Sequence, residues 1–591
     1  MIKLMLSNRI NRNIIQLLCV VAITLAAARA AVAGSDEKQE NSLFKVDRVP
    51  FSTFGAWTSI SIPRDETELF FRNHHGKGAD LFPLRTLVDG KVVTPEIIAT
   101  PWLLTLKTDQ GQVEICYERP GTVRMRGQGV GFQMGKRNLI YNIGPRLLTF
   151  NMPFSRRYQV EVLHGSASLR QLVATQPVFP KVALIAPAED GRWEIAIDAY
   201  DSTWVRPDRA EFDECVKSAK EAFTRFLNAM PDVRPQDRHS QRLATYVVWT
   251  STVQPRGLVK RHSLLMSKNW MNRIWSWDHC FNAMALAKGH PKLAVDQMLT
   301  MVDLQDEFGS YPDSFNDLEL TYNFSKPPVH GLAFREVLRR MPEKPSSAAM
   351  QMIYASLAKQ TNWWMKHRRL KDQRLPHYLH GNDSGWDNSS MFKKGVPLVA
   401  PDLAALLIVQ MDVLAELASE LGKDDERDQW KKRANALQQA LVEELWRDDR
   451  FVARLANDGS YVESQSLIPW LPIILGQRLP AEMRVALKNG IEGHLTKWGL
   501  STEKLGSPFY RKDGYWKGSI WAPSTFIAVT GLERSGFKDL ANTIANRFCT
   551  MCGSSGFPEN FNAETGEPLR CPAYTWTASV FLLFAENMNR N

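Results

Sequence analysis

Two acidic residues stand in the sequence contexts best suited to acid–base chemistry. Asp387 lies within residues 385–388 (Gly-Trp-Asp-Asn), and Glu559 lies within residues 557–561 (Phe-Pro-Glu-Asn-Phe). Cleavage of an acetal needs two carboxyl groups, one to protonate the leaving oxygen and one to activate water or to attack the sugar. Because an Asp in a Gly- and Asn-rich loop is usually a turn former, chemistry alone leaves three rivals: Asp278, Asp383 and Glu564.

Aromatic residues gather beside these acids. Fourteen of the 18 tryptophans lie beyond residue 236, many of them in expected loops. The CH faces of a sugar stack on aromatic rings and its hydroxyls need directional partners, so aromatic residues next to Asp, Glu and Asn are typical of a sugar site. For each aromatic, packing in the core is an even alternative. The expected pocket wall is Trp275, Trp277, Asp278, His279, Trp386, Asn388, Trp516, Lys517, Trp521, Asn560 and Trp576.

Two other classes of protein fit some of these residues. A polysaccharide lyase or sugar epimerase needs a side chain that removes a proton from the sugar, and His279, His330 and Tyr574 are available. A glycan-binding protein without catalysis would keep the aromatic walls, but the pair Asp387 and Glu559 favours an enzyme. The sequence has no phosphate-binding loop, dinucleotide-binding fingerprint or zinc signature, so no cofactor is expected, and calcium has no EF-hand spacing to support it.

The first third of the chain has the period of strands. Apolar and polar residues alternate around Val113, Tyr158 and Trp193, and the turn signals at residues 109–111 (Asp-Gln-Gly) and 189–191 (Glu-Asp-Gly) separate them. Short strands with regular turns predict an antiparallel β-sandwich.

After residue 206 the period becomes helical. Residues 210–229 predict a helix, and a connector with Pro231 and Pro235 follows. About a dozen helices without intervening strands predict a large all-α domain, which a closed double ring of six hairpins or a solenoid would satisfy. No fixed-period repeat favours the solenoid. The expected helices are 239–251, 278–289, 292–307, 346–365, 424–446, 480–492, 523–533, 537–549 and 574–588, with an apolar face through Leu403, Leu407, Met411, Leu414 and Ala418.

The start of the chain differs from the rest. Its basic residues, its apolar run over residues 14–28 and its Ala31-Val32-Ala33 resemble a secretory signal peptide with cleavage before Gly34. A periplasmic or secreted enzyme is therefore expected. Six of the seven cysteines remain after residue 33, too few for a disulfide-built scaffold, and buried thiols or one bridge through Cys571 are expected. The net charge of +10 is scattered, so no nucleic-acid partner is predicted.

Ordered motifs in the helical part resemble those of glycoside hydrolase family 63, the processing α-glucosidase type, with trehalases as more distant relatives. Their order along the chain makes the resemblance specific, and it covers most of residues 237–591. The motifs are residues 275–281 (Trp-Ser-Trp-Asp-His-Cys-Phe), 326–331 (Lys-Pro-Pro-Val-His-Gly), 380–389 (His-Gly-Asn-Asp-Ser-Gly-Trp-Asp-Asn-Ser), 515–521 (Tyr-Trp-Lys-Gly-Ser-Ile-Trp), 558–562 (Pro-Glu-Asn-Phe-Asn) and 574–578 (Tyr-Thr-Trp-Thr-Ala).

The resemblance implies an (α/α)6 barrel, an N-terminal β-sandwich and an inverting mechanism, with Asp387 as general acid and Glu559 as general base. Asn560 would orient the base or its water. Lys517 stands where the family has an arginine, and Ser519 where it has a proline, while residues 382–383 (Asn-Asp) replace its usual acid beside the serine. Since lysine cannot make arginine's planar bidentate contacts, these departures bear on sugar specificity.

The expected organisation follows from these observations. Residues 1–33 would form the signal, 34–208 the β-sandwich, 209–236 a helical linker and 237–591 the barrel. The expected activity is that of an inverting, exo-acting glycoside hydrolase, an α-glucosidase acting on an oligosaccharide or glucoside, with no membrane partner once the signal is removed. The N-terminal part has no specific match and would either buttress the barrel or lend a loop that closes the pocket.

Overall fold

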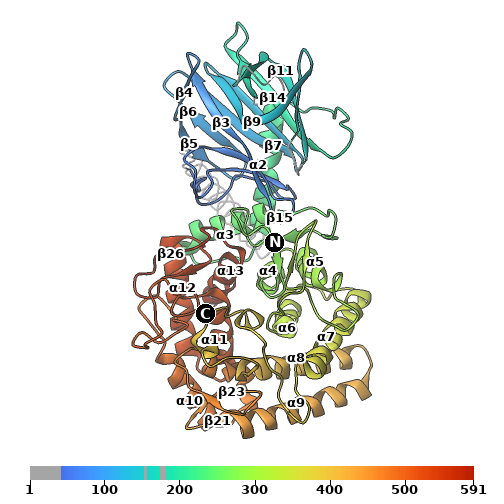
Figure 1. The fold of residues 1–591 in the computed structure, drawn as a ribbon, viewed down its shortest axis with the longest axis vertical. Helices are drawn as coiled ribbons and strands as arrows, with labels where there is room; N and C mark the ends of the chain where they lie inside the picture. Colours follow the sequence, from blue (N-terminus) through green and yellow to red (C-terminus); the bar gives the residue numbers. More distant parts are fainter. Residues whose placement is uncertain (1–41, 152–155, 173–180, 591) are drawn as a thin grey trace, which may run out of the picture.

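A computed structural model describes residues 42–151, 156–172 and 181–590. The chain forms a strand-rich N-terminal part and a helical C-terminal part (Figure 1). The expected signal peptide lies outside the described residues. This two-part architecture confirms the predicted fold class.

The N-terminal strands form an antiparallel, sandwich-like arrangement. The long β9 (Gly131–Gly144) pairs with β3 and β13 through its first half and with β10 through its second, and so joins the two layers. One layer runs β1-β2-β3-β9 with β4, β12 and β13, and the other runs β10-β11-β14-β8-β7-β6-β5. The remaining bounds are β1 Thr58–Ser61, β2 Phe70–Asn73, β3 Ala79–Val88, β4 Lys91–Val93, β5 Glu96–Ala99, β6 Leu104–Lys107, β7 Gln112–Arg119, β8 Thr122–Gln128, β10 Leu147–Asn151, β11 Arg157–His164, β12 Ser166–Gln171, β13 Lys181–Ala186 and β14 Arg192–Tyr200.

The apolar residues that alternate with polar ones in the sequence form part of the sandwich core. Val113 on β7, Tyr158 on β11 and Trp193 on β14 are all buried with their i+2 and i+4 neighbours. The two turn signals separate β6 from β7 and β13 from β14. These three strands therefore bury a face between the layers, as a sandwich requires.

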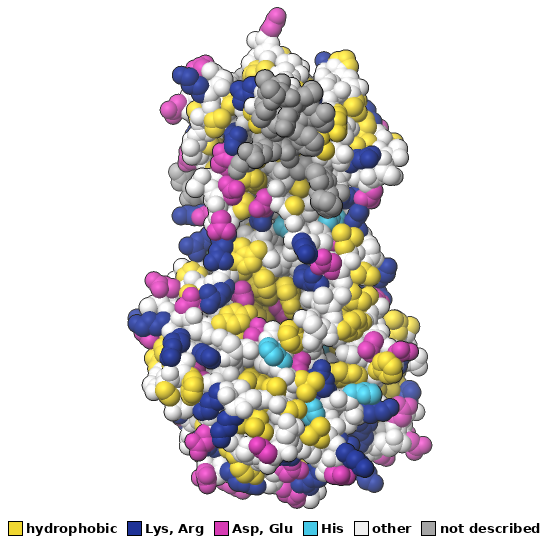
Figure 2. All heavy atoms as spheres, viewed as in Figure 1, with side chains coloured by type: hydrophobic (Ala, Val, Ile, Leu, Met, Phe, Trp, Pro, Cys, Tyr) yellow, Lys and Arg dark blue, Asp and Glu magenta, His cyan; other side chains and the backbone are white. Residues whose placement is uncertain are grey.

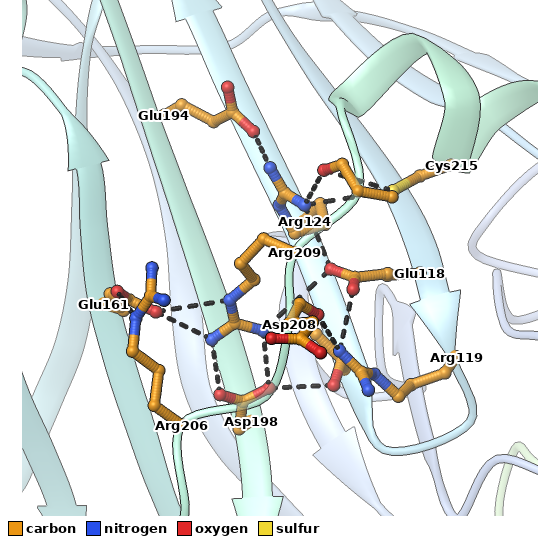
Figure 3. A network of polar contacts seen from close by, with 12 residues as sticks. Glu118, Arg119, Arg124, Glu161, Glu194, Asp198, Arg206, Asp208, Arg209 and Cys215 are labelled. Carbon is orange, nitrogen blue, oxygen red and sulfur yellow. Dashed lines mark hydrogen bonds and ion pairs between the residues drawn. The ribbon is translucent and has the colours of Figure 1, made fainter.

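A network of charged side chains holds residues 201–211, which join β14 to the first helix, to the sheet (Figure 3). Arg209 donates to Glu161 on β11 at 2.9 Å and to Asp198 on β14 at 2.6 Å. Arg124 on β8 pairs with Glu118 at 3.0 Å and also with Glu194. This segment is thereby fixed where it enters α2 (Phe212–Ala229), the predicted helix, which packs against β7 and α3.

The helical part is a closed double ring. The inner ring runs α4 (Asp278–Leu286), α6 (His330–Arg340), α8 (Pro401–Glu420), η4 (Ile468–Arg478), α11 (Ala522–Arg534) and α13 (Thr575–Arg590), and α13 packs back against α4. An outer element alternates with each: α3 (Arg238–Ser251), α5 (Pro291–Val302), α7 (Ser347–His367), α9 (Asp424–Leu445), α10 (Ala481–Glu492) and α12 (Lys538–Ser555). Six such pairs make an (α/α)6 barrel, with short strands β15–β26 in the loops.

Burial distinguishes the two rings. Every residue of the inner α4 is buried, whereas the outer α9 buries one stripe that includes Trp430, Leu437 and Leu441. A helix surrounded by other helices must be apolar on most faces, while an outer helix keeps a charged face toward water. All nine helices predicted by range beyond residue 236 are present, with ends shifted by up to six residues.

The inner position between α9 and α10 departs from the prediction. Residues Ile468–Arg478 are assigned as a 3-10 segment with Pro472 inside it and a backbone break at Gly476. Because proline removes a backbone donor and clashes with the preceding turn, this apolar stretch cannot continue as an α-helix. The sequence reading found no helix here for the same reason.

Charged side chains of both signs are mixed over one face of the molecule. Lys and Arg side chains are spread among Asp and Glu over the face shown in Figure 2, and hydrophobic side chains gather where the helical part meets the strands. All six cysteines of the described residues are buried and free, and Cys571 donates to the Ser267 hydroxyl at 3.1 Å instead of forming a bridge. Among the described helices, none has the length and apolarity needed to cross a membrane.

Candidate active site

A cavity of about 390 Å³ lies at the end of the inner ring where its helices begin. Its lining comes from the loops that precede α4, α6, α8, α11 and α13, and from the first turns of α4 and α13. The volume lies in the range of about 300–1,000 Å³ found for small-molecule sites. The closed ring therefore brings segments some 300 residues apart around one space that fits a short ligand.

Seven of the thirteen predicted site residues line this cavity. Both proposed acids do so, together with five residues of the expected wall: Asp387, Glu559, Trp275, Trp277, Asp278, Trp516 and Trp576.

The other six predicted residues lie outside the lining. Trp521 stacks on Trp516 with ring centroids 4.0 Å apart, and Trp386 packs against Trp516 at a tilt of 40° with centroids 4.8 Å apart. Asn388 is exposed and joins two loops, accepting from the Trp516 N–H at 2.9 Å and donating to the Gly514 carbonyl at 3.1 Å. The remaining three are His279 and Asn560, which are fully buried, and Lys517, which is half-buried.

The aromatic cluster of Trp277, Trp516, Trp521 and Trp576 fixes the backbone that carries Glu559, the expected general base. The Trp576 indole N–H donates to the Glu559 carbonyl at 3.0 Å. Trp576 itself packs edge-on against Trp277 and Trp521. Because a buried indole N–H needs a partner, the cluster and the Glu559 segment hold each other in place.

A glycine allows the loop of Asp387 to approach this cluster. Gly385 has a left-handed backbone with φ of +74°, and a Cβ there would lie 2.6 Å from the Trp277 ring. Any side chain would both strain the backbone and clash. Gly385 is therefore needed for Asp387 to face the cavity beside Trp277.

Tyr515 links the two acids. Its hydroxyl donates to Glu559 at 3.4 Å and also interacts with the carboxyl of Asp387, lowering the pKa of both groups somewhat. Tyr515 has a φ of +62°, and the Trp521 indole donates to its carbonyl at 3.1 Å. A strained residue held by its surroundings is typical of functional sites.

Burial keeps protons on these carboxyl groups to unusually high pH. It raises the pKa of Glu559 to about 7, and the charge of Asp387 adds to that rise. Burial also raises the pKa of Asp387, against the opposing effect of the nearby Lys326 ammonium. The pKa of Asp278, buried and accepting from the Tyr574 hydroxyl at 2.9 Å, is raised to about 7. Near neutral pH the cavity thus holds both protonated and ionised carboxyls, which acid–base catalysis requires.

The rivals Asp383 and Glu564 have other partners. Asp383 is buried beneath the loop and accepts from Arg368 at 3.0 Å and from the backbone N–H groups of Ser325 and Leu379. Glu564 pairs with Lys512 at 3.0 Å on the outside. Neither lines the cavity.

One group of side chains has the composition of a metal site. The ligand atoms of His279, Cys280 and His330 lie within 4.8 Å of one another and are buried. A chain of hydrogen bonds runs from Gln410 through Gln360, whose amide Nε2 donates to His330 Nδ1 at 3.2 Å. Neutral His330 then carries its proton on Nε2, which cannot bind a metal. In this tautomer His330 offers no free nitrogen lone pair to a cation.

Twelve lining residues were not selected from the sequence. Lys326, Asn382, Gly385, Tyr515 and Tyr574 stood in quoted motifs, so a signal existed for these five. The other seven had no motif to mark them: Met271, Arg273, Asp313, Ser314, Thr321, Asn323 and Phe324. They come together only because the strands β17 (Ile274–Trp275), β18 (Ser314–Phe315) and β19 (Leu320–Thr321) pair beside the cavity.

Comparison with known proteins identifies the family. A profile described as the mannosylglycerate hydrolase MGH1-like glycoside hydrolase domain matches residues 271–577, just over half of the chain. The chain belongs to glycoside hydrolase family 63. It is a glycoside hydrolase, and the resemblance seen in its motifs is confirmed.

The individual relatives of the chain are distant. Mannosylglycerate hydrolase from Rubrobacter radiotolerans is 22% identical over 55% of this chain and 96% of its own length. Glucosylglycerate hydrolase from Mycolicibacterium hassiacum is 21% identical over 52% and 91%. Periplasmic trehalase from Escherichia coli is 21% identical over 47% of this chain and 58% of its own length.

Solved structures support the fold of this family 63 chain. The mannosylglycerate hydrolase from Thermus thermophilus in complex with Tris superposes with a TM-score of 0.51 at 18% identity, over 57% of this chain and 98% of that one. A bacterial glucoamylase complexed with acarbose superposes with a TM-score of 0.60 at 10% identity, over 93% and 95%. At these identities the likeness concerns the fold alone.

Proposed function

We propose that the chain is an inverting, exo-acting hydrolase of short α-glycosides of glucose or mannose, with Asp387 as general acid and Glu559 as general base. The observation that carries this is the pairing of buried Glu559 with half-buried Asp387 in one cavity, linked by Tyr515 and walled by tryptophans. Membership of family 63 supports the reaction class.

In the proposed mechanism, the sugar lies against the tryptophans between the two acids. Asp387 gives its proton to the glycosidic oxygen, and burial shifts its pKa upward, the direction that a general acid needs. Glu559 takes a proton from a water that attacks the anomeric carbon from the opposite face. Removal of that proton needs ionised Glu559, so its raised pKa predicts that kcat/KM falls as pH drops below about 7. The positively charged Lys326, 3.3 Å from Asp313, offsets the charge of the remaining carboxyls.

Two cationic residues that line the cavity, Lys326 and Arg273, favour an anionic leaving group. Arg273 lines the cavity and bonds Ser314 at 3.1 Å and Glu319 at 2.6 Å, and its Nη2 is buried without a hydrogen-bond partner among the described residues. A guanidinium edge of this kind suits a carboxylate. The relatives named for mannosylglycerate and glucosylglycerate make these two glycosides the first substrates to test.

A substrate panel tests the proposed specificity. We expect faster hydrolysis of mannosylglycerate or glucosylglycerate than of maltose, isomaltose or trehalose. Arg273→Met should raise KM for the glycerate glycoside by about 10- to 100-fold, because a charge-assisted hydrogen bond is lost, and should change KM for uncharged glucosylglycerol by about twofold at most. Equal loss on both glycerol and glycerate glycosides would contradict carboxylate recognition, and no hydrolysis of any α-glycoside would contradict the function.

The stereochemistry of the product tests the inverting mechanism. An α-glycoside should release the β-anomer first, since water replaces the leaving group from the opposite face in one displacement. Proton NMR during the first minutes of turnover reads the anomer before mutarotation. Initial release of the α-anomer would contradict the mechanism and make one carboxylate a nucleophile.

We also propose that the enzyme is exported to the periplasm or secreted. The signal-like residues 1–33 support this, and export of a related enzyme has precedent in the periplasmic trehalases. The mass of the protein from its native host should correspond to a chain that begins at Gly34.

A further inference from the structure

One wall of the cavity is a three-stranded sheet that the N-terminal part touches directly. Trp275 on β17, Ser314 on β18 and Thr321 on β19 face the cavity from this sheet. Two-residue strands have little stability of their own. The position of this wall must therefore be set by neighbouring structure.

The neighbour is the loop Asn73–Gly78 between β2 and β3 of the N-terminal sandwich. Its Gly76 carbonyl accepts two amide N–H groups, from Asn272 at 2.9 Å and from Asn316 at 2.7 Å. Asn272 precedes β17 and Asn316 follows β18, so one carbonyl oxygen joins two strands of the wall. Gly76 has a φ of +54°, which favours glycine at this position.

A buried carboxylate makes the second connection. Asp317, whose side chain is 0% exposed, accepts from His75 Nδ1 at 2.9 Å and from the Gly76 N–H at 2.9 Å. Arg256 lies 3.4 Å from the same carboxylate and balances its charge. Arg156 donates to His75 Nε2 at 3.4 Å, so neutral His75 carries its proton on Nδ1, where it points to Asp317.

These contacts give the N-terminal part a role in substrate binding. We propose that the loop Asn73–Gly78 sets the position of the β17–β18–β19 wall, with His75, Asn272, Asn316 and Asp317 as positioning residues. The inference rests on the proposed function only for the identity of the cavity as the substrate site. In this proposal the N-terminal sandwich supports one side of the pocket.

A pair of variants at His75, which does not line the cavity, tests the proposal. His75→Leu places an apolar side chain beside Trp57 and removes the donor to Asp317. His75→Asn keeps an N–H donor. We expect His75→Leu to raise KM about tenfold with kcat within about twofold, since the wall binds substrate while the acids lie on other loops. Amide hydrogen exchange in residues 271–275 and 314–321 should become faster. His75→Asn should stay near the wild type in both measurements.

A control separates positioning from general destabilisation. Asp198→Asn weakens the charged network around Arg209 in the same sandwich (Figure 3), and none of the residues described in that network lines the cavity. It should lower the melting temperature without changing KM or exchange in the wall. Unchanged exchange and KM in His75→Leu, or an equal rise of KM in Asp198→Asn, would overturn the proposal. If wild-type protein hydrolysed no glycoside, the proposed function would fail, and exchange in the wall would still decide the positioning role.

Discussion

Replacing Asp387 with Asn, or Glu559 with Gln, is expected to lower kcat by about 10²–10⁴-fold, the usual contribution of a general acid or base. Each carboxyl serves a different proton transfer, so neither can replace the other. Glu564→Gln is the matched control, because Glu564 pairs with Lys512 outside the cavity. Steady-state kinetics on the best substrate of the panel measures the effect. Near-normal turnover of Glu559→Gln together with loss in Glu564→Gln would show that the base is misassigned.

A glycosyl fluoride distinguishes which carboxyl is the acid. Fluoride leaves with little protonation, so a variant without the acid should regain much of its rate on this substrate, while a variant without the base should not. This comparison matters because burial raises the pKa of both groups, and that of Glu559 to about 7, so electrostatics alone does not separate donor from acceptor. Recovery in Glu559→Gln rather than in Asp387→Asn would reverse the two roles.

The second large effect concerns stability. Glu559→Gln should raise the free energy of unfolding at pH 8 by on the order of 2–3 kcal/mol. The pKa of the Glu559 carboxyl is about 7 when folded, against an ordinary value of 4.5, so the folded state holds its proton more tightly. Ionised Glu559 therefore destabilises the fold. The penalty is absent below about pH 4.5, grows as pH rises, and is complete above about 7.

Urea unfolding at pH 4.5 and at pH 8 measures this effect, with tryptophan fluorescence reporting mainly on the barrel. The variant should gain stability at pH 8 and little or none at pH 4.5. Asp278→Asn should behave alike, since the pKa of Asp278 is also raised to about 7 and Asn can still accept from Tyr574. An equal gain at both pH values, or none at pH 8, would contradict the account. A gain confined to pH 8 would show that burying the carboxyls of Glu559 and Asp278 in the cavity costs stability.

The sequence predicted those features that short segments encode. Periodicity in α8 and α13 and alternation in β7 and β14 gave the two parts of the fold, because each pattern reflects one buried face. The acids Asp387 and Glu559 were found through aromatic neighbours and motif order. The inner 3-10 segment Ile468–Arg478 was not found, because its prolines interrupt the helical signal.

Contacts between segments far apart in the sequence could not be predicted from local patterns. Arg273 and Asp313 reach the cavity through strand pairing, which no motif announces. Trp516 and Trp521 share one motif, yet Trp516 lines the cavity and Trp521 stacks beneath it. Asp278 and His279 are adjacent on α4, where successive side chains point about 100° apart, so only Asp278 faces the cavity. Composition identifies the region of the site, whereas the direction of each side chain determines which residue lines the cavity.

The packing of α13 against α4 has a consequence for the order of events during synthesis. The ring closes through a contact between segments almost 300 residues apart, and closing so long a loop costs entropy before any contact rewards it. The last helix also brings the Trp576 indole that fixes the Glu559 carbonyl. A nascent chain that lacks its final residues therefore has an open ring and an unsupported carboxyl, so hydrolytic competence arrives only with the carboxyl-terminal helix.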